Sequence, residues 1–225
     1  MSNNLGFKQE PQKYLASPRI KDYYERMYTE LVKRNCKSVL DIGTASGDFL
    51  YFMPNFLTGT GIDSNELLIS HANNSRKKDN LQFICASFES FKPDQKFDAI
   101  TILGTLLCVD DFEIVLNKCL VLKPKLICIN DFFNRQNIDI RLGYKRSSTS
   151  ASSFNYAYNI VSISTIESYL TSKKATWTFE KYEMTSTLFQ EEDALSNYHA
   201  VFNGERILTN GLDLILHGYN LFIQP

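Results

Sequence analysis

The chain has 225 residues, of which 44% are apolar and 22% are charged, and its formal net charge is −1. This length suits one domain with a sizeable core, and the near-zero charge gives no general attraction for nucleic acid. The N-terminus lacks the apolar stretch of a secretory signal, and the longest late apolar run, 212–223, falls short of the roughly 20 residues that span a bilayer. We therefore expect a cytoplasmic protein without a membrane span, whose five scattered cysteines are reduced core thiols.

The N-terminal segment, 1–36, is expected to be mainly one amphipathic helix. Ser17-Pro18 is a typical helix start, because proline fits the first helical position. Apolar side chains then follow at helical spacing. They are Ile20, Tyr23, Tyr24, Met27 and Leu31.

Between residues 37 and 131, short apolar strands alternate with amphipathic helices. KSVLDI, GTGID, LQFICA, FDAITIL and KLICIN are typical of buried strands, and helices are expected from Gly47, over 66–76 and over 111–120. This alternation predicts parallel strands with helices on both faces, which is a doubly wound α/β sheet.

The pattern changes after residue 131. Residues 132–160 are polar and aromatic without a clean period, and we interpret them as an insertion with partial helix and a lid function. The capped helix SISTIESYLTS and the strands ATWTFEKYEMTS, GERILTN and LILHGYNLFI are expected next, with a second substrate-side insertion at 187–204. These strands would form an antiparallel edge of a mostly parallel sheet, so that residues 1–225 make one domain.

The turn VLDIGTASGDFL joins the first strand of this core to its helix. In open α/β sheets such a turn lines the ligand crevice, and glycines let the backbone bend sharply or approach a ligand closely. A dinucleotide fingerprint would need its third glycine at the position of Asp48, whose charge opposes a pyrophosphate at a helix N-terminus. What remains is Gly43-x-Ala45-x-Gly47 with an acid, Asp41, two residues earlier.

These residues resemble the first motif of the class I S-adenosylmethionine (SAM)-dependent methyltransferases, Asp/Glu-x-Gly-x-Gly-x-Gly, with Ala45 in place of the middle glycine. The resemblance implies a Rossmann-like methyltransferase fold, with a seven-stranded, mostly parallel sheet, and SAM as the cofactor. It also implies that the cofactor lies against Asp41, Gly43, Thr44, Ala45 and Gly47. For Asp41 a second role stays open, namely capping the loop by binding backbone amides.

The resemblance continues along the core. Asp63 ends the second strand where the family's acid holds both ribose hydroxyls, with Ser64 beside it. Ser87 and Phe88 correspond to adenine neighbours, although Ser87 replaces the usual aspartate, and Leu103 corresponds to a neighbour of the methionine part. The alternatives are that Asp63 caps the following helix, a role that Ser64 would also suit, and that Phe88 and Leu103 are core residues.

Methyl transfer requires an aligned acceptor and, when that acceptor is a hydroxyl, a group that takes its proton. Asp131, directly after the fifth strand, is the first candidate for this base, against a role in loop hydrogen bonding, and His199 is the second. Arg19 is a candidate partner of the methionine carboxylate, although exposed arginines on amphipathic helices are common. No metal is expected, because the fourth strand ends in Leu103-Gly104-Thr105 and supplies no acid.

The C-terminal half shows a weaker similarity to methyltransferases associated with bacterial surface-polysaccharide and other glycan biosynthesis. It lies in FNYAYNIVSISTIESYL and NGERILTNGLDLILHGYNLFI. It implies O-methylation of a small-molecule or carbohydrate acceptor. As a partner besides the acceptor, we expect a second copy of the chain in a homodimer. Two alternatives stay open: an NAD(P)-dependent oxidoreductase of similar fold, and a non-catalytic methyltransferase-like subunit.

Overall fold

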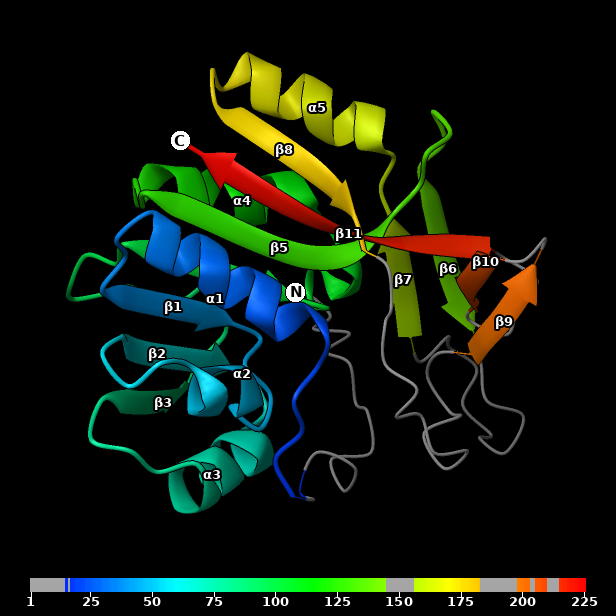
Figure 1. Ribbon diagram of the computed structural model, residues 1–225. Coiled ribbons are helices and arrows are strands. Elements are labelled where there is room, and N and C mark those ends of the chain that lie inside the picture. The colour runs from blue at the N-terminus through cyan, green and yellow to red at the C-terminus, as the bar shows by residue number, and fades with distance from the viewer. Residues whose placement is uncertain (1–14, 16, 145–155, 183–197, 203–204, 210–214) are drawn as a thin grey trace.

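The computed structural model describes residues 15, 17–144, 156–182, 198–202, 205–209 and 215–225 (Figure 1). Seven strands follow the order β3-β2-β1-β4-β5-β11-β8, parallel from β3 to β5 and antiparallel at β11 and β8. The predicted doubly wound sheet with an antiparallel edge is therefore confirmed. Its strands are β1 (Ser38–Ile42), β2 (Thr58–Asp63), β3 (Leu81–Cys85), β4 (Ala99–Leu103), β5 (Leu126–Phe133), β8 (Thr176–Lys181) and β11 (Ile215–Gln224).

Helices cover both faces of this sheet because successive strand residues point to opposite sides. In β1, Val39 packs into a core with α1, α2 and α3, whereas Leu40 packs into a core with α4 and α5. The covered strands are apolar on both faces, as parallel strands between two helical layers must be. The helices are α1 (Tyr23–Lys33), α2 (Asp48–Phe52), α3 (Glu66–Ser75), α4 (Phe112–Val121) and α5 (Ile163–Ser172).

The N-terminal helix is present, but it begins at Tyr23 and not directly after Pro18. Ile20 precedes the helix and is 69% exposed, so the expectation that it belongs to the apolar helix face was wrong. The backbone N–H of Arg19 donates instead to the Asp48 carboxylate at 3.2 Å, which draws the preceding segment across the glycine turn. A contact distant in sequence thus overrides the local helix signal.

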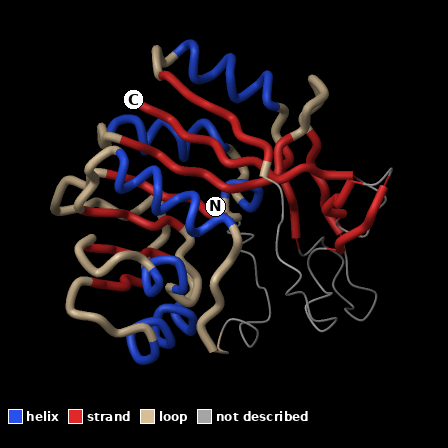
Figure 2. The backbone as a smooth tube through the Cα atoms, viewed as in Figure 1, coloured by secondary structure: helices blue, strands red, loops and turns tan. Residues whose placement is uncertain are grey.

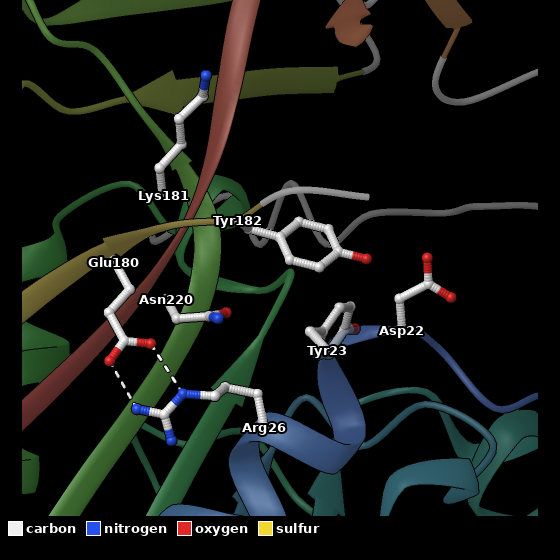
Figure 3. A pocket seen from close by; sticks show the side chains of 7 residues that line it. All are labelled: Asp22, Tyr23, Arg26, Glu180, Lys181, Tyr182 and Asn220. Atoms are coloured by element: carbon white, nitrogen blue, oxygen red, sulfur yellow. Dashed lines mark hydrogen bonds and ion pairs between the residues drawn. The ribbon is translucent and has the colours of Figure 1, made fainter. Parts of the chain in front are cut away.

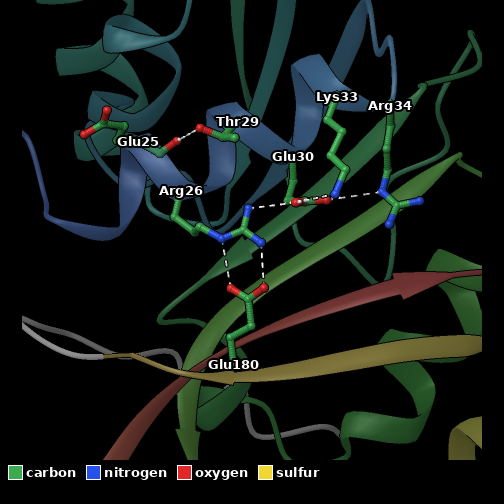
Figure 4. A network of polar contacts seen from close by, with 7 residues as sticks. All are labelled: Glu25, Arg26, Thr29, Glu30, Lys33, Arg34 and Glu180. Atoms are coloured by element: carbon green, nitrogen blue, oxygen red, sulfur yellow. Dashed lines mark hydrogen bonds and ion pairs between the residues drawn. The ribbon is translucent and has the colours of Figure 1, made fainter.

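Helix α1 is attached to the antiparallel edge through one arginine (Figure 4). Arg26 donates to both carboxylate oxygens of Glu180 in β8, at 2.9 and 2.6 Å, and to Glu30 at 2.8 Å. Burial alone would raise the pKa of Glu30, but the bond from Arg26 and the nearby cations Lys33 and Arg34 lower it. The network fixes the N-terminal helix against the sheet on the face that also carries α2, the helix that follows the glycine turn.

Segment 132–160 differs from its prediction. In its described part, β6 (Ile140–Tyr144) and β7 (Tyr156–Ile160) pair as an antiparallel hairpin where no strands were expected. The expected partial helix is not among these residues, and 145–155 lie outside the described part of the segment. The Asn159 side chain donates to the carbonyl of Val109, and Arg141 pairs with Asp110. The hairpin is therefore anchored to the loop after β4, and it lies beyond the ends toward which the arrows of β1 and β5 point in Figure 1; Figure 2 shows the same backbone as a tube.

The predicted second insertion, 187–204, lies outside the described residues except at 198–202. Those five residues form β9 (Tyr198–Phe202), which pairs with β10 (Glu205–Thr209). β10 in turn pairs with the beginning of β11, so these two strands extend the sheet past its seven-stranded part.

Candidate active site

The loops after β1 and β4 meet where the strand order reverses, the usual ligand position in an open α/β sheet. Gly43 has φ +72, and a Cβ on it would lie 2.2 Å from the Thr105 hydroxyl oxygen, so only glycine lets the two loops approach this closely. Gly104 has φ +69, and nothing lies within 4 Å of where its Cβ would be. The β4 loop thus leaves open space beside a tightly packed turn.

Asp63 joins the glycine turn to the end of β2. One carboxylate oxygen accepts the N–H of Ala45 at 3.0 Å, and the other accepts the N–H of Asn65 at 2.9 Å. Burial raises the pKa of Asp63, and these backbone bonds partly offset the increase. A carboxylate has about four acceptor sites, and these backbone bonds do not use all of them. The carboxylate is thus held rigidly with acceptor capacity to spare, which fits a cofactor ribose.

The alternative role of Asp63 as a helix cap does not hold. Asn65 is the N-cap of α3, and its side-chain oxygen accepts from Leu67 at 3.1 Å and from Leu68 at 3.3 Å. Ser64, which also suited a capping role, is exposed at the start of the same loop. Asn65 has the extended backbone conformation of an ordinary N-cap. The sequence thus contained the capping residue, but it is Asn65, directly after the expected Asp63 and Ser64.

Asp41, in β1 just before the glycine turn, links this strand to β4. Its carboxylate is 2% exposed and accepts the hydroxyl of Thr101, from the neighbouring β4, at 2.6 Å. Burial raises the pKa of Asp41 to about 6, and the Thr101 bond offsets part of that effect. The proposed amide-capping role is replaced by a strand-to-strand hydrogen bond.

The turn itself uses left-handed backbone at three positions. Gly47 has φ +80 and Ala45 has φ 50, so alanine occupies a conformation that side chains rarely adopt. Thr44, directly before Ala45, is buried, and its backbone N–H donates to the carbonyl of Ile62 at 3.0 Å. These contacts bind the turn to the end of β2.

The residues expected beside adenine and methionine lie at the same edge of the sheet. Ser87 starts a short turn in which its hydroxyl oxygen accepts the N–H of Ser90 at 3.3 Å. Both Phe88 and Leu103 are partly buried. Phe88 packs against the core on the α4 side of the sheet, and Leu103 packs against the core on the α1 side. The core interpretation of these two side chains thus has structural support, and their contact with a cofactor stays a prediction.

Asp131 lies near the carboxyl end of β5 and is 4% exposed. It accepts the N–H of Phe132 at 2.9 Å and the N–H of Leu107 at 3.1 Å, which belongs to the short helix η2 (Leu106–Cys108) after β4. The loop hydrogen-bonding role therefore exists. Burial nevertheless raises the pKa of Asp131 to about 7, because the backbone bonds do not compensate fully for lost hydration. The carboxyl can thus exchange a proton near neutral pH.

Two candidates remain, His199 as a second base and Arg19 as a partner of the methionine carboxylate, and both roles stay predictions. The backbone of His199 lies in β9 opposite Leu208, in the extension of the sheet rather than at the ends of β4 and β5. Arg19 is exposed in the segment before α1, where its backbone binds Asp48. Asp48 also pairs with the buried Arg76 at 2.8 Å, a contact that the sequence analysis missed because nothing local links residues so far apart.

The described residues show neither a metal site nor a membrane-spanning helix. No three His, Cys, Asp or Glu side chains in the described ranges gather as metal ligands. Within the same ranges, no helix combines the length and the apolar character needed to cross a membrane.

Comparison with known proteins identifies the family. A family model described as a methyltransferase domain matches residues 33–183. No curated protein matches the chain in sequence.

Solved structures share the fold at low sequence identity. The plantazolicin methyltransferase BpumL, in complex with a pentazolic desmethylPZN analog and SAH, is 18% identical with a TM-score of 0.56 over 96% of this chain and 86% of that chain. A putative S-adenosylmethionine-dependent methyltransferase from Listeria monocytogenes is 9% identical with a TM-score of 0.62 over 90% and 98%. The DhpI–SAM–HEP complex is 13% identical with a TM-score of 0.54 over 96% and 92%.

The family model spans most of the chain and covers the glycine turn, Asp63 and Asp131. The chain therefore belongs to the methyltransferase domain family and is, as its glycine turn predicted, a SAM-dependent methyltransferase.

Proposed function

We propose that the protein transfers the methyl group of SAM to a hydroxyl oxygen of a small-molecule or carbohydrate acceptor. The observation that carries this proposal is the buried Asp131 carboxyl, whose pKa of about 7 suits a general base near neutral pH. A hydroxyl must lose its proton as it attacks, whereas many other acceptors need no such base. Asp131 lies beside η2, at the carboxyl edge where Gly104 leaves open space.

Different residues of the crevice would contact different parts of the cofactor. When bound, SAM supplies a methyl group on a positively charged sulfur. Asp63 would accept the two ribose hydroxyls with its remaining lone pairs. The backbone of Gly43, Ala45 and Gly104 would lie against the sulfonium and the methionine part, and Ser87 and Phe88 would lie beside the adenine base.

The acceptor side is supported by the hairpin β6–β7 and by a nearby pocket of about 250 Å³ (Figure 3). Tyr23 and Tyr182 pack edge to face, with ring centroids 5.8 Å apart, and give the lining an aromatic surface. Arg26 in the pocket already binds two glutamates, so the site favours a neutral hydroxylated ligand over an anion. The lining residues are Asp22, Tyr23, Arg26, Glu180, Lys181, Tyr182 and Asn220.

The test is an assay of S-adenosylhomocysteine (SAH) formation from SAM with panels of hydroxyl-bearing and amine-bearing acceptors. Asp131→Asn should lower kcat with the best hydroxyl acceptor by about 10²–10⁴-fold, the usual effect of removing a general base, and leave SAH affinity unchanged. The matched control is Asp79→Asn, which removes an exposed carboxylate. Turnover of amines alone, or full activity of Asp131→Asn, would show that the proposed chemistry is wrong.

Family membership and the same assay of SAH formation also separate the remaining alternatives. Membership in the methyltransferase family decides against the NAD(P)-dependent oxidoreductase. The non-catalytic subunit would bind SAH but form none from SAM with any acceptor pool. His199 is the second candidate base, and His199→Gln should lower kcat if it serves instead of Asp131. A homodimer and a cytoplasmic location remain predictions, which light scattering and cell fractionation would test.

A further inference from the structure

One lysine of α4 holds the turn that follows β3. The ammonium of Lys118 donates to the carbonyl of Phe88, to that of Glu89 at 3.1 Å and to that of Phe91 at 2.7 Å. A lysine ammonium has three N–H donors and no acceptor, so these carbonyls use its full capacity. The ammonium also lies 4.6 Å from the centroid of the Phe88 ring, within the range of a cation–π contact.

The same turn is closed at its other end by Ser87. The Ser87 carbonyl accepts the N–H of Phe91 at 2.9 Å, and the Ser87 hydroxyl oxygen accepts the N–H of Ser90. Ser87 therefore binds the amide end of the turn, and Lys118 binds its carbonyl end. Glu89 and Ser90 are exposed, so side-chain burial contributes little there and these polar contacts determine the shape of the turn.

We propose that Lys118 is a positioning residue for the adenine base of the cofactor, acting through the turn 87–91. This inference rests on the proposed function, in which Ser87 and Phe88 lie beside the base. Adenine presents an N–H donor next to a ring-nitrogen acceptor, and a fixed backbone can match that pair with a carbonyl and an N–H. Hypoxanthine reverses both positions, so a turn held in one shape rejects it because the polar groups of the turn and of the base no longer pair. A turn released from Lys118 loses this selectivity.

The experiment compares calorimetric affinities for SAH and for its hypoxanthine analogue, S-inosylhomocysteine. Wild-type protein should prefer SAH by about tenfold or more, the effect of one mismatched polar pair. Lys118→Met should weaken SAH binding about tenfold and leave the analogue nearly unchanged, so that the preference falls toward one. The matched control is Lys125→Met, which removes an ammonium bound to Asp98 at 2.9 Å and to the Asn35 carbonyl at 3.2 Å. Lys125 and Asp98 directly precede β5 and β4, at the end of the sheet opposite the crevice. This control variant should keep both affinities.

Lys118→Arg is the second variant if Lys118→Met does not fold. It retains the charge, but a planar guanidinium cannot direct donors from one point to three carbonyls, so the preference for SAH should again fall. Equal weakening of both ligands, an unchanged preference, or a wild-type protein that does not distinguish them would overturn the inference and leave the proposed function intact. A wild-type protein that binds neither ligand would instead overturn the proposed function, and this inference with it.

Discussion

Replacing Asp131 with asparagine should change how stability depends on pH. Burial raises the pKa of Asp131 from 3.8 to about 7, so the folded protein binds a proton more tightly than the unfolded chain does. Between these two values the free energy of unfolding therefore falls as pH rises. A displacement of roughly three pKa units, at about 1.4 kcal/mol each, corresponds to up to about 4 kcal/mol. This contribution is present below pH 4 and is lost once pH exceeds 7.

Asparagine does not titrate, so this slope belongs to the wild type alone. The other raised carboxyls, Asp41 and Asp63, are present in both proteins, and their effects cancel in the difference. Asparagine can accept only one of the two backbone N–H groups, which adds a cost of about 1–3 kcal/mol that does not depend on pH.

The assay is urea unfolding followed by circular dichroism at several pH values between about 4 and 8. The free energy of unfolding of the wild type minus that of Asp131→Asn should decrease by several kcal/mol across this range. A difference that stays constant would mean that Asp131 has an ordinary pKa. The general-base proposal would then lose its main support.

Three further substitutions test the glycine turn by urea unfolding. Ala45→Gly should raise the free energy of unfolding by about 1 kcal/mol, because alanine holds φ 50 there; a loss of stability would show that the turn is not strained. Gly43→Ala should lower it by about 2–3 kcal/mol, since the new Cβ would overlap the Thr105 hydroxyl, and an unchanged value would mean that the loops separate easily. Thr101→Val should cost about 2 kcal/mol at neutral pH and less in acid, because the ionised Asp41 loses its partner; a pH-independent cost would contradict this reading.

The regular part of the fold follows from local pattern. Strands apolar on both faces, spaced by amphipathic helices, predict the parallel sheet, and Asp63 is found at the end of β2 where the family pattern requires an acid. Such features repeat along the chain and need no knowledge of distant contacts.

The differences come from contacts that the local pattern cannot show. Helix α1 begins late because the N–H of Arg19 binds Asp48, 29 residues away. The hairpin β6–β7 depends on anchors such as the Asn159 bond to Val109, and its sequence has no clean period. The Lys118 contacts were missed for the same reason, because an exposed-looking helix lysine gives no signal for three carbonyls about 30 residues earlier.

The most direct test of the central claim is a crystal structure of the protein with SAH. Both ribose hydroxyls should lie within hydrogen-bonding distance, about 2.5–3.0 Å, of the Asp63 carboxylate, with the sulfur beside Gly43 and Gly104. A complex with the ribose bound elsewhere, and Asp63 facing only Ala45 and Asn65, would contradict the account.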